Sequence, residues 1–434
     1  MQFRPTVTNP FILFLFLIFN VGSINKSIAC SGYKITKGNT TIFGSNEDAW
    51  RTTPHIWFEN ATPKTKYGAV FTGSRFDGNN GYAPQSGMNE TGLAFERLVA
   101  HFPLKTTIKK ATIINPTLFL KDVLHQCKSV EEVKAYISRY DYSTFIEDVF
   151  LYVDQSGKYL IVEPYTITLG VQPTYLISNF CPSITSKQKA NKLERYRNGM
   201  AFIKRGYDTS LNYCTALSDT MHVCRKKIGD GTLLTSIWNL NNLNFNLFFY
   251  HDYKTSKQFN LLDELKKGDH IIAIETLFPP NIEFEKLGNY KTPKNSILIG
   301  IFIVVSAVLF LVTALFFLIQ YLRKREINRY SKIKLLIVPL SLILAYYMVV
   351  LSGSINVFYF SAPYKDPSNW LVSLSSYIPF LLAVLIIPVW LLTINLWRKN
   401  LWPAVSKGLL TLNALTYTLL IGLFTYWEFY IVWN

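Results

Sequence analysis

The residue best placed to do chemistry is Cys30, because of what precedes it. Arg4 and an apolar run at 11–21 lead to Ser27-Ile28-Ala29, a pattern typical of a secretory signal peptide with small residues at its cleavage site. Removal of residues 1–29 would make Cys30 N-terminal. A free α-amino group has a pKa of about 7.7–8.0, so it can accept the proton of the thiol in the same residue. The pattern therefore predicts a nucleophile that carries its own base.

A second hypothesis for Cys30 is lipidation, as in a bacterial lipoprotein. Ser27 is a poor match to the leucine that is usual three residues before a lipidated cysteine. Acylation of the α-amine would remove the base from the first hypothesis. The lipoprotein and the enzyme are therefore mutually exclusive predictions for this residue.

Three polar motifs follow Cys30 at characteristic intervals. They are Gly44-Ser45-Asn46-Glu47-Asp48, Asn89-Glu90-Thr91-Gly92-Leu93 and Ile177-Ser178-Asn179. In their order and spacing, these motifs and Cys30 resemble the N-terminal-nucleophile (Ntn) hydrolases of the choloylglycine hydrolase, penicillin V acylase and peptidase C45-like acyltransferase superfamily. The resemblance covers about residues 30–288.

The resemblance implies a catalytic role for each of four residues. Cys30 would be the nucleophile and, through its amine, the general base, and Asp48 would hydrogen-bond and tune that amine. Asn89 and Asn179 would donate hydrogen bonds to the oxyanion of the tetrahedral intermediate. Loss of one such donor typically lowers the rate about 100-fold or more.

The arginines of the family pattern are less well matched. The family usually has an arginine just before the asparagine of the first motif, where this chain has Ser45. If that arginine activates the thiol, another cation must take its place. The family's later catalytic arginine corresponds to Arg195 or Arg197, and we choose Arg195. The departure at Ser45 supports a rival hypothesis, a non-catalytic ligand-sensing or accessory membrane protein that keeps the fold.

The C-terminal part, residues 295–434, consists mainly of long apolar segments. Each is long enough to cross a hydrocarbon core of about 30 Å. These segments are at about 297–319, 335–358, 371–397 and 409–433. The sequence therefore predicts a transmembrane domain of four helices and a lipid bilayer as a partner.

The positive charges of this part predict its orientation. Nine of the ten Lys and Arg residues after residue 300 fall within 323–334 and 398–407, between the first and second and between the third and fourth spans. Short loops rich in Lys and Arg stay in the cytoplasm. We therefore expect residues 30–288 on the extracytoplasmic side of the plasma membrane. Transport through the spans is disfavoured, because Glu428 is the one intramembrane ionisable candidate.

Composition narrows the partners further. The formal net charge is +16, and residues after 300 contribute +7 of it, from ten basic and three acidic side chains. We attribute this +7 to the orientation of the spans in the membrane. The charge that remains on the exported domain is mild, so nucleic acid is not expected as a partner. The six His and five Cys show no His-Glu-x-x-His or paired Cys-x-x-Cys spacing, so no cofactor and no metal is predicted. Without Cys30 the cysteines are Cys127, Cys181, Cys214 and Cys224, which allow three disulfide pairings.

Local patterns predict a mixed α and β chain before the spans. Two apolar runs flank a turn at Asp154–Gly157, and Ser129 begins a helix capping box. The resemblance implies a four-layer αββα fold, to which an all-α membrane domain is joined. We expect an Ntn cysteine amidase that cleaves a linear, non-peptide amide of an N-acyl compound through a thioester, with release to water or, less often, to an acceptor amine. A different nucleophile, Cys127 with His125, is disfavoured because helix positions two apart face different directions.

Overall fold

The computed structural model describes residues 30–48, 52–104, 110–225, 230–323, 329–360, 362–366 and 369–432. The chain divides into two compact units, one within Ser27–Gly288 and the other including Asn289–Asn434. The predicted signal peptide and its cleavage site lie outside the described residues.

The first sheet of the N-terminal unit is built around the hairpin that follows Cys30. Its seven strands are all antiparallel, in the order β14-β1-β2-β16-β17-β18 with β15 paired to β16. The strands are β1 (Ser31–Lys37), β2 (Thr40–Asp48), β14 (Thr174–Ile177), β15 (Cys224–Arg225), β16 (Asp230–Asn239), β17 (Asn244–Phe249) and β18 (Lys257–Asn260). The turn between β1 and β2 places Gly38 at φ +58°, a conformation that glycine adopts without steric strain. The hairpin therefore brings Cys30 and Asp48 to the same end of the sheet.

The second sheet has eight antiparallel strands in the order β13-β12-β11-β8-β7-β4-β3-β19. The strands are β3 (His55–Glu59), β4 (Ala69–Gly73), β7 (Ser86–Asn89), β8 (Ala94–Val99), β11 (Asp148–Val153), β12 (Tyr159–Glu163), β13 (Thr166–Gly170) and β19 (His270–Ala273). Every residue of β11 and β12 is buried. Strands that are buried on both faces require cover on both sides of the sheet.

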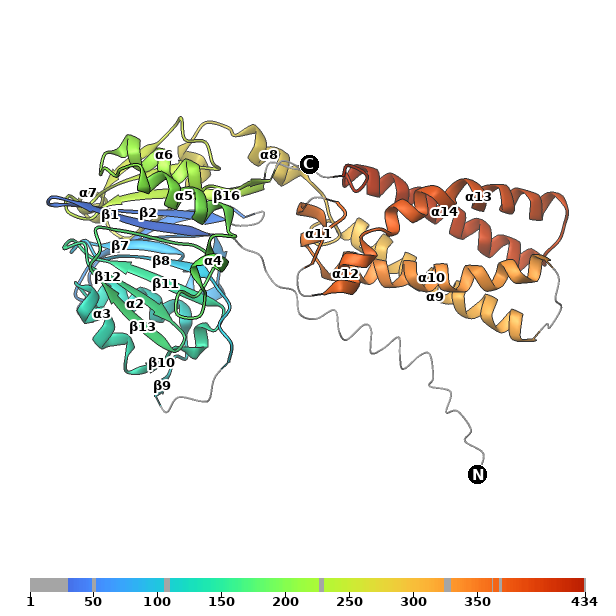
Figure 1. The fold of residues 1–434 in the computed structure, drawn as a ribbon, viewed down its shortest axis with the longest axis horizontal. Coiled ribbons are helices and arrows are strands. Elements are labelled where there is room, and N and C mark those ends of the chain that lie inside the picture. Colours follow the sequence, from blue (N-terminus) through green and yellow to red (C-terminus); the bar gives the residue numbers. More distant parts are fainter. Residues whose placement is uncertain are drawn as a thin grey trace, which may run out of the picture. The chain divides into compact units, whose positions relative to one another are not determined.

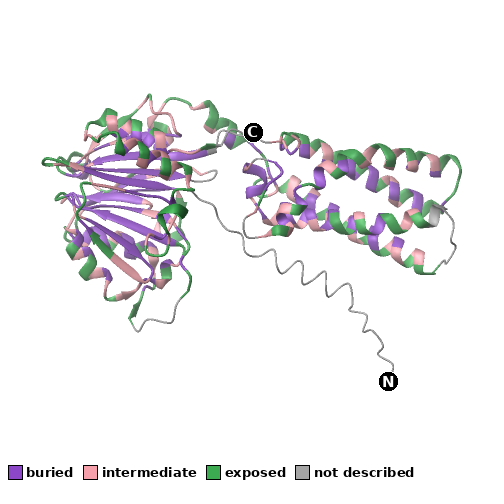
Figure 2. Ribbon diagram, in the orientation of Figure 1, coloured by how far each residue is buried: buried purple, intermediate pink, exposed green. Residues whose placement is uncertain are grey.

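Helices provide the outer cover of both sheets. Helices α5 (Glu194–Lys204) and α6 (Leu211–Met221) pack on the first sheet, and α2 (Pro116–Gln126) and α3 (Val130–Ile137) pack on the second. Figure 1 shows the resulting four layers, and Figure 2 shows that the two sheets between the helices are the buried part of this unit. The predicted αββα fold is confirmed. The predicted helix cap is present, since the Ser129 side chain accepts a hydrogen bond from the amide of Glu132, while the Glu132 carboxylate accepts from the amide of Lys128, one residue before the cap.

Short elements complete the N-terminal unit. The two-stranded pairs β5–β6 and β9–β10 lie outside the two large sheets. These elements are β5 (Arg75–Phe76), η2 (Gly78–Asn80), β6 (Tyr82–Ala83), β9 (Ala111–Thr112), β10 (Tyr140–Asp141), η3 (Tyr142–Phe145), α4 (Lys187–Ala190), α7 (Leu261–Leu265), η4 (Ile274–Leu277) and α8 (Ile282–Asn289).

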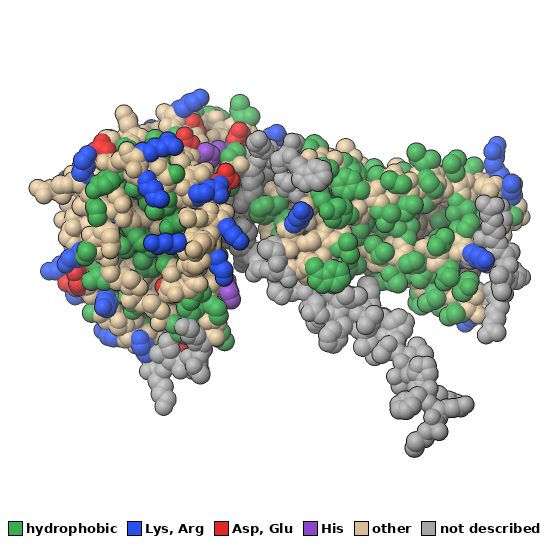
Figure 3. Space-filling model, viewed as in Figure 1, with side chains coloured by type: hydrophobic (Ala, Val, Ile, Leu, Met, Phe, Trp, Pro, Cys, Tyr) green, Lys and Arg blue, Asp and Glu red, His purple; other side chains and the backbone are tan. Residues whose placement is uncertain are grey.

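The C-terminal unit is built from helices. They are α9 (Ile297–Arg323), α10 (Arg329–Gly353), α11 (Asn356–Tyr359), α12 (Trp370–Ser375), α13 (Ile378–Arg398) and α14 (Ala404–Tyr426). The described residues contain four stretches that are long and apolar enough to cross a membrane, in α9, in α10, across α12 and α13, and in α14. Figure 3 shows apolar side chains over the surface of this unit, as a lipid-facing surface requires. The predicted four-helix architecture is confirmed.

Candidate active site

Cys30 lies directly before β1, and its side chain is buried. The Sγ atom is 3.9 Å from the backbone oxygen of Asp48 and 3.7 Å from Nε2 of Gln85. Ser178, at the end of the neighbouring β14, donates a hydrogen bond of 3.1 Å to the backbone oxygen of Cys30. Burial raises the pKa of the Cys30 thiol well above its usual range, and the charges of Asp48 and Glu96 raise it further. A thiol in this environment needs a base before it can attack.

Asp48 and Arg195 form an ion pair beside this cysteine. Nη1 of Arg195 is 3.0 Å from Oδ2 of Asp48, and the two side chains are only 15% and 4% exposed. Arg195 is the second residue of α5, so the helix that covers the first sheet supplies the cation. Arg197 instead donates to the backbone oxygen of Asn191. The structure therefore brings together Cys30, Asp48 and Arg195, and it distinguishes Arg195 from Arg197.

Asn179 lies next to the site. Its Nδ2 donates a hydrogen bond of 2.8 Å to the backbone oxygen of Val99, at the end of β8. Asn179 follows Ser178, which contacts Cys30, and its bond to Val99 ties the first sheet to the second. A primary amide has two N–H donors, and this contact uses one of them. The predicted role of Asn179 as an oxyanion donor stays a prediction, for which its second N–H is the available donor.

Asn89 occupies a different environment, at the end of β7 against α2. Its Nδ2 donates to the backbone oxygens of Leu124 and Cys127, each at 2.7 Å. Its Oδ1 accepts from the amide and hydroxyl of Thr91 and from the amide of Leu93. Both amide hydrogens are thus engaged away from Cys30. The oxyanion role of Asn89 stays a prediction, and it requires the side chain to leave these contacts.

Two buried carboxyl groups that sequence reasoning did not single out lie between the sheets. Successive residues of β2 alternate sides, so Asn46 faces α6 while Glu47 faces the second sheet, where it accepts hydrogen bonds from Thr72 and Ser86. Burial raises the pKa of Glu47 to about 7. Because a glutamate of this kind retains its proton under mildly acidic conditions, the site contains a titratable group near neutrality.

Glu96, on β8, is the second of these carboxyl groups. A Cβ atom added to Gly32 would lie 1.9 Å from Oε2 of Glu96, so the carboxyl group sits directly over the start of β1. Gly32 pairs with Ser45 on β2. Burial raises the pKa of Glu96 well above its usual range, and the charge of Glu47 raises it further. At the place where the resembling family carries an arginine, this protein therefore has Ser45, whose neighbour across the strand pair, Gly32, lies under a carboxyl group with a raised pKa. A glutamate that precedes Arg97 in a segment with apolar residues on either side, Ala94–Val99, was the available sequence signal.

The remaining cysteines are placed elsewhere. None of the five cysteines, all within the described part of the chain, forms a disulfide. Cys127, Cys181 and Cys214 are buried. The rival nucleophile pair is not supported by geometry, since both ring nitrogens of His125 contact other groups, the backbone oxygen of Tyr67 and the carboxylate of Glu59.

Comparison with known proteins adds a family. Residues 50–179 match the family described as linear amide C–N hydrolases, choloylglycine hydrolase family. This segment contains Asn89 and Asn179 and begins after Cys30 and Asp48. No curated protein matches the chain.

Solved structures with similarity to this chain include those of two bacterial enzymes. Two variants of the conjugated bile acid hydrolase from Clostridium perfringens are each 18% identical, with a TM-score of 0.41, and cover 58% of this chain and 97% of their own. Penicillin V acylase from Agrobacterium tumefaciens is 14% identical, with a TM-score of 0.39, and covers 51% of this chain and 82% of its own.

Proposed function

We propose that this chain, residues 50–179 of which match the choloylglycine hydrolase family of linear amide C–N hydrolases, cleaves a linear, non-peptide amide bond of an N-acyl compound with Cys30 as the nucleophile. The observation that carries the proposal is the meeting of Cys30, Asp48 and Arg195 at one end of β1 and β2. These residues come from the two strands of the first hairpin and from a helix far along the chain. Such a convergence is what a catalytic unit built around an N-terminal residue needs.

The first half of the reaction forms a thioester. Removal of residues 1–29 frees the α-amine of Cys30, which takes the proton of the thiol as the sulfur attacks the acyl carbonyl carbon. The oxyanion of the tetrahedral intermediate accepts hydrogen bonds, and Asn179 supplies one of them with the amide hydrogen that Val99 does not use. When the intermediate collapses, the C–N bond breaks and the α-ammonium group gives its proton to the leaving nitrogen. The products of this half are the acylated Cys30 and a free amine.

The second half releases the acyl group. The α-amine now takes a proton from water, whose oxygen attacks the thioester carbon. Collapse breaks the C–S bond, and the sulfur recovers a proton from the ammonium group. The products are a carboxylic acid and the original enzyme. Attack by an acceptor amine in place of water would give acyl transfer by the same route.

The surroundings of Cys30 explain why its own amine matters. Burial and three carboxyl groups raise the pKa of the thiol, so an unassisted thiolate would be scarce at neutral pH. An ammonium group formed in the same residue places a positive charge beside the sulfur and stabilises the thiolate. Asp48 would hold this amine, and Arg195 would hold Asp48, which makes Arg195 a positioning residue.

Amine release from N-acyl substrates tests the proposal. Cys30→Ala should abolish release of a chromogenic amine from a panel of N-acyl compounds, while Cys127→Ala, which removes a buried thiol from the helix-covered face of the second sheet, should keep more than half of it. Both variants should still be cleaved after Ala29 or be produced already starting at residue 30. Full activity of Cys30→Ala would refute the nucleophile assignment.

One observation favours a second candidate function, the binding of an N-acyl ligand without turnover. Ser45 stands where the resembling family has an arginine, and the neighbouring Glu96 raises the pKa of the Cys30 thiol, so neither group stabilises a thiolate. A sensor of this kind would bind the same compounds and release no amine. Equilibrium binding of an N-acyl compound with no product after prolonged incubation, equally for wild type and Cys30→Ala, would select it over the enzyme.

A further inference from the structure

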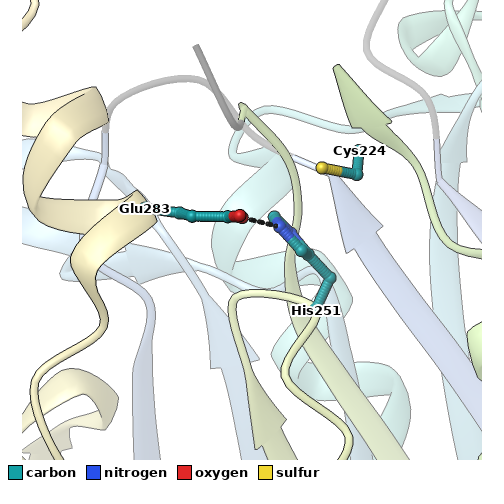
Figure 4. Close-up of side chains that lie close together, drawn as sticks. All are labelled: Cys224, His251 and Glu283. Carbon is teal, nitrogen blue, oxygen red and sulfur yellow. Dashed lines mark hydrogen bonds and ion pairs between the residues drawn. The ribbon is translucent and has the colours of Figure 1, made fainter. Parts of the chain in front are cut away.

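Three potential metal ligands meet at an edge of the first sheet. Cys224 lies in β15, His251 follows β17, and Glu283 lies in the first turn of α8. One ligand atom from each, a sulfur, a ring nitrogen and a carboxylate oxygen, lies within 4.8 Å of the other two. Figure 4 shows the three side chains directed toward one another. Because long segments separate them in the sequence, no local spacing motif announces this cluster.

The donor set suits a zinc-like ion. Zn²⁺ binds cysteine sulfur at about 2.3 Å and histidine nitrogen or carboxylate oxygen at about 2.0–2.2 Å, so the donors around one ion lie about 3.3–3.8 Å apart. Nε2 of His251 is already 2.8 Å from Oε2 of Glu283. Closing an ion between the three groups therefore requires side-chain adjustments of an ångström or so, which the exposed Cys224 and Glu283 can make.

The imidazole is held in the orientation that a metal ligand needs. Nδ1 of His251 lies 3.3 Å from the backbone oxygen of Thr232. This contact favours a proton on Nδ1, so that Nε2 can bind an ion once the ion displaces the proton that Nε2 shares with Glu283, and the result is the arrangement typical of metal-binding histidines. The ring itself is only 8% exposed and stacks on His222, with ring centroids 5.7 Å apart.

The backbone at this position is strained. Tyr250 and His251 both have positive φ, 51° and 45°, although neither is glycine. Consecutive residues in the left-handed region are unfavourable and persist only where the surroundings hold them. The His251 ring that contacts Glu283 is carried by this turn.

We propose that Cys224, His251 and Glu283 bind one divalent transition-metal ion of the zinc type, with water in the fourth position. Binding replaces the thiol proton of Cys224 and the proton between His251 Nε2 and Glu283 with the ion, and both protons are released to solvent. The ion would fasten α8 to β15 and to the turn after β17. The ion site is linked to the candidate active site through Thr232. The backbone oxygen of Thr232 contacts His251, and Thr232 pairs with Asp48 between β16 and β2.

Metal loading of the purified full-length chain tests the proposal. After dialysis against a chelator, addition of Co²⁺ alone should give one equivalent of bound ion with a sulfur-to-cobalt charge-transfer band, and Zn²⁺ should displace it. Cys224→Ser should abolish the band. Glu283→Gln, at an exposed position where misfolding is not expected, should weaken Co²⁺ binding about 10-fold or more.

A matched control comes from a second histidine–carboxylate pair in the same unit. Nε2 of His270 is 3.1 Å from Oε2 of Glu264, so His270→Ala removes a similar pair and should leave the cobalt band unchanged. His251→Ala should lose it. The proposal is overturned if the wild-type chain binds less than one equivalent of Co²⁺ or Zn²⁺, or if Cys224→Ser binds Co²⁺ as tightly and with the same band.

Discussion

At the scale of single residues, the candidate site has no arginine at position 45, where the resembling family has one, and its cation is Arg195, which pairs with Asp48. Asp48 carries the negative charge that would face an α-amine, and Arg195 is the cation that neutralises it. The carboxyl groups of Glu47 and Glu96 lie on the other side, between the sheets, where burial favours their neutral forms. The site therefore relies on proton transfer within Cys30 more than on a permanently charged neighbour.

The ion pair gives a prediction for Arg195. Arg195→Gln leaves the buried Asp48 carboxylate without its charged partner, and loss of a hydrogen bond to a charged group costs about 1.5–3 kcal/mol. We expect kcat/KM for amide release to fall about 10- to 100-fold, with a shifted pH profile because the amine is held differently. Arg197→Gln, on the same helix, should stay within about twofold. Equal effects of the two substitutions would show that Arg195 contributes only to the surface of α5.

The two asparagines should behave differently. Asn179→Ala should lower kcat about 100-fold with little change in melting temperature. Asn89→Ala removes a side chain that satisfies two backbone carbonyls and two backbone amides, so it should lower the free energy of unfolding by about 2–4 kcal/mol. Activity and thermal unfolding measured on the same preparations separate the two effects. A stable Asn89→Ala protein with a 100-fold loss in kcat would instead support its oxyanion role.

Glu47 gives a prediction for the pH dependence of stability. Its pKa in the folded protein, about 7, is above the ordinary value of a glutamate, so the folded state holds a proton that the unfolded state has already lost. The stabilisation is complete below about pH 4.5 and is lost as the pH rises toward 7. Glu47→Gln should therefore make the melting temperature less dependent on pH between 5 and 7.5. Parallel curves for wild type and variant would contradict the raised pKa.

At the scale of elements, the close approach of the two sheets depends on Gly32. A Cβ atom at this position would overlap the Glu96 carboxyl group of the opposite sheet. Gly32→Ala should therefore displace Glu96, reduce activity and lower the melting temperature. Adding Glu96→Ala should restore part of both, because it removes the overlapping atoms. If the double variant shows only the sum of the two single effects, the contact between Gly32 and Glu96 is not the cause.

Features of the fold and of the candidate site could be predicted from the sequence where they form between residues close together in the chain. The β11–β12 hairpin, with its turn at Asp154–Gly157, and the helix cap at Ser129 are local, and their turn and cap residues were visible in the sequence. The choice of Arg195 over Arg197 depended on which face of α5 meets the first sheet. Glu96 was not singled out, because only the packing of two sheets brings it over Gly32.

The three potential metal ligands could not be predicted from the sequence for the same reason. Cys224, His251 and Glu283 meet because β15, the turn after β17 and α8 converge in space, and none of them carries a local ligand spacing. Asn89 shows the opposite case. Its motif was visible in the sequence, but the same residue types that make an oxyanion donor also make a turn, and here the side chain closes the turn after β7.

At the scale of the whole molecule, the chain has an N-terminal unit whose residues 50–179 match the linear amide C–N hydrolase family, called here the hydrolase unit. The described residues of the chain also include four helical stretches that are long and apolar enough to span a membrane. The basic residues at the ends of α9, α13 and the start of α14 predict which side each loop faces. We propose that the hydrolase unit lies on the extracytoplasmic face, with the bilayer as its anchor.

Single cysteines introduced at exposed lysines test this orientation. A membrane-impermeant thiol reagent should label Lys64→Cys, in the hydrolase unit, in intact cells. Lys399→Cys, between α13 and α14, should be labelled only after the membrane is permeabilised. The reverse pattern would place the hydrolase unit in the cytoplasm and would also remove the expected route to signal-peptide cleavage. Exposed Cys224 is replaced by serine in the background of both variants so that it does not contribute signal.

The most direct measurement for the central claim is mass spectrometry of the N-terminal peptide, isolated after acid quenching during turnover of an N-acyl substrate. The account predicts a peptide that begins at Cys30 with a free α-amine, a fraction of which carries the substrate's acyl group on sulfur and loses it to hydroxylamine. A lipid on Cys30, a blocked amine or a first residue other than Cys30 would contradict it.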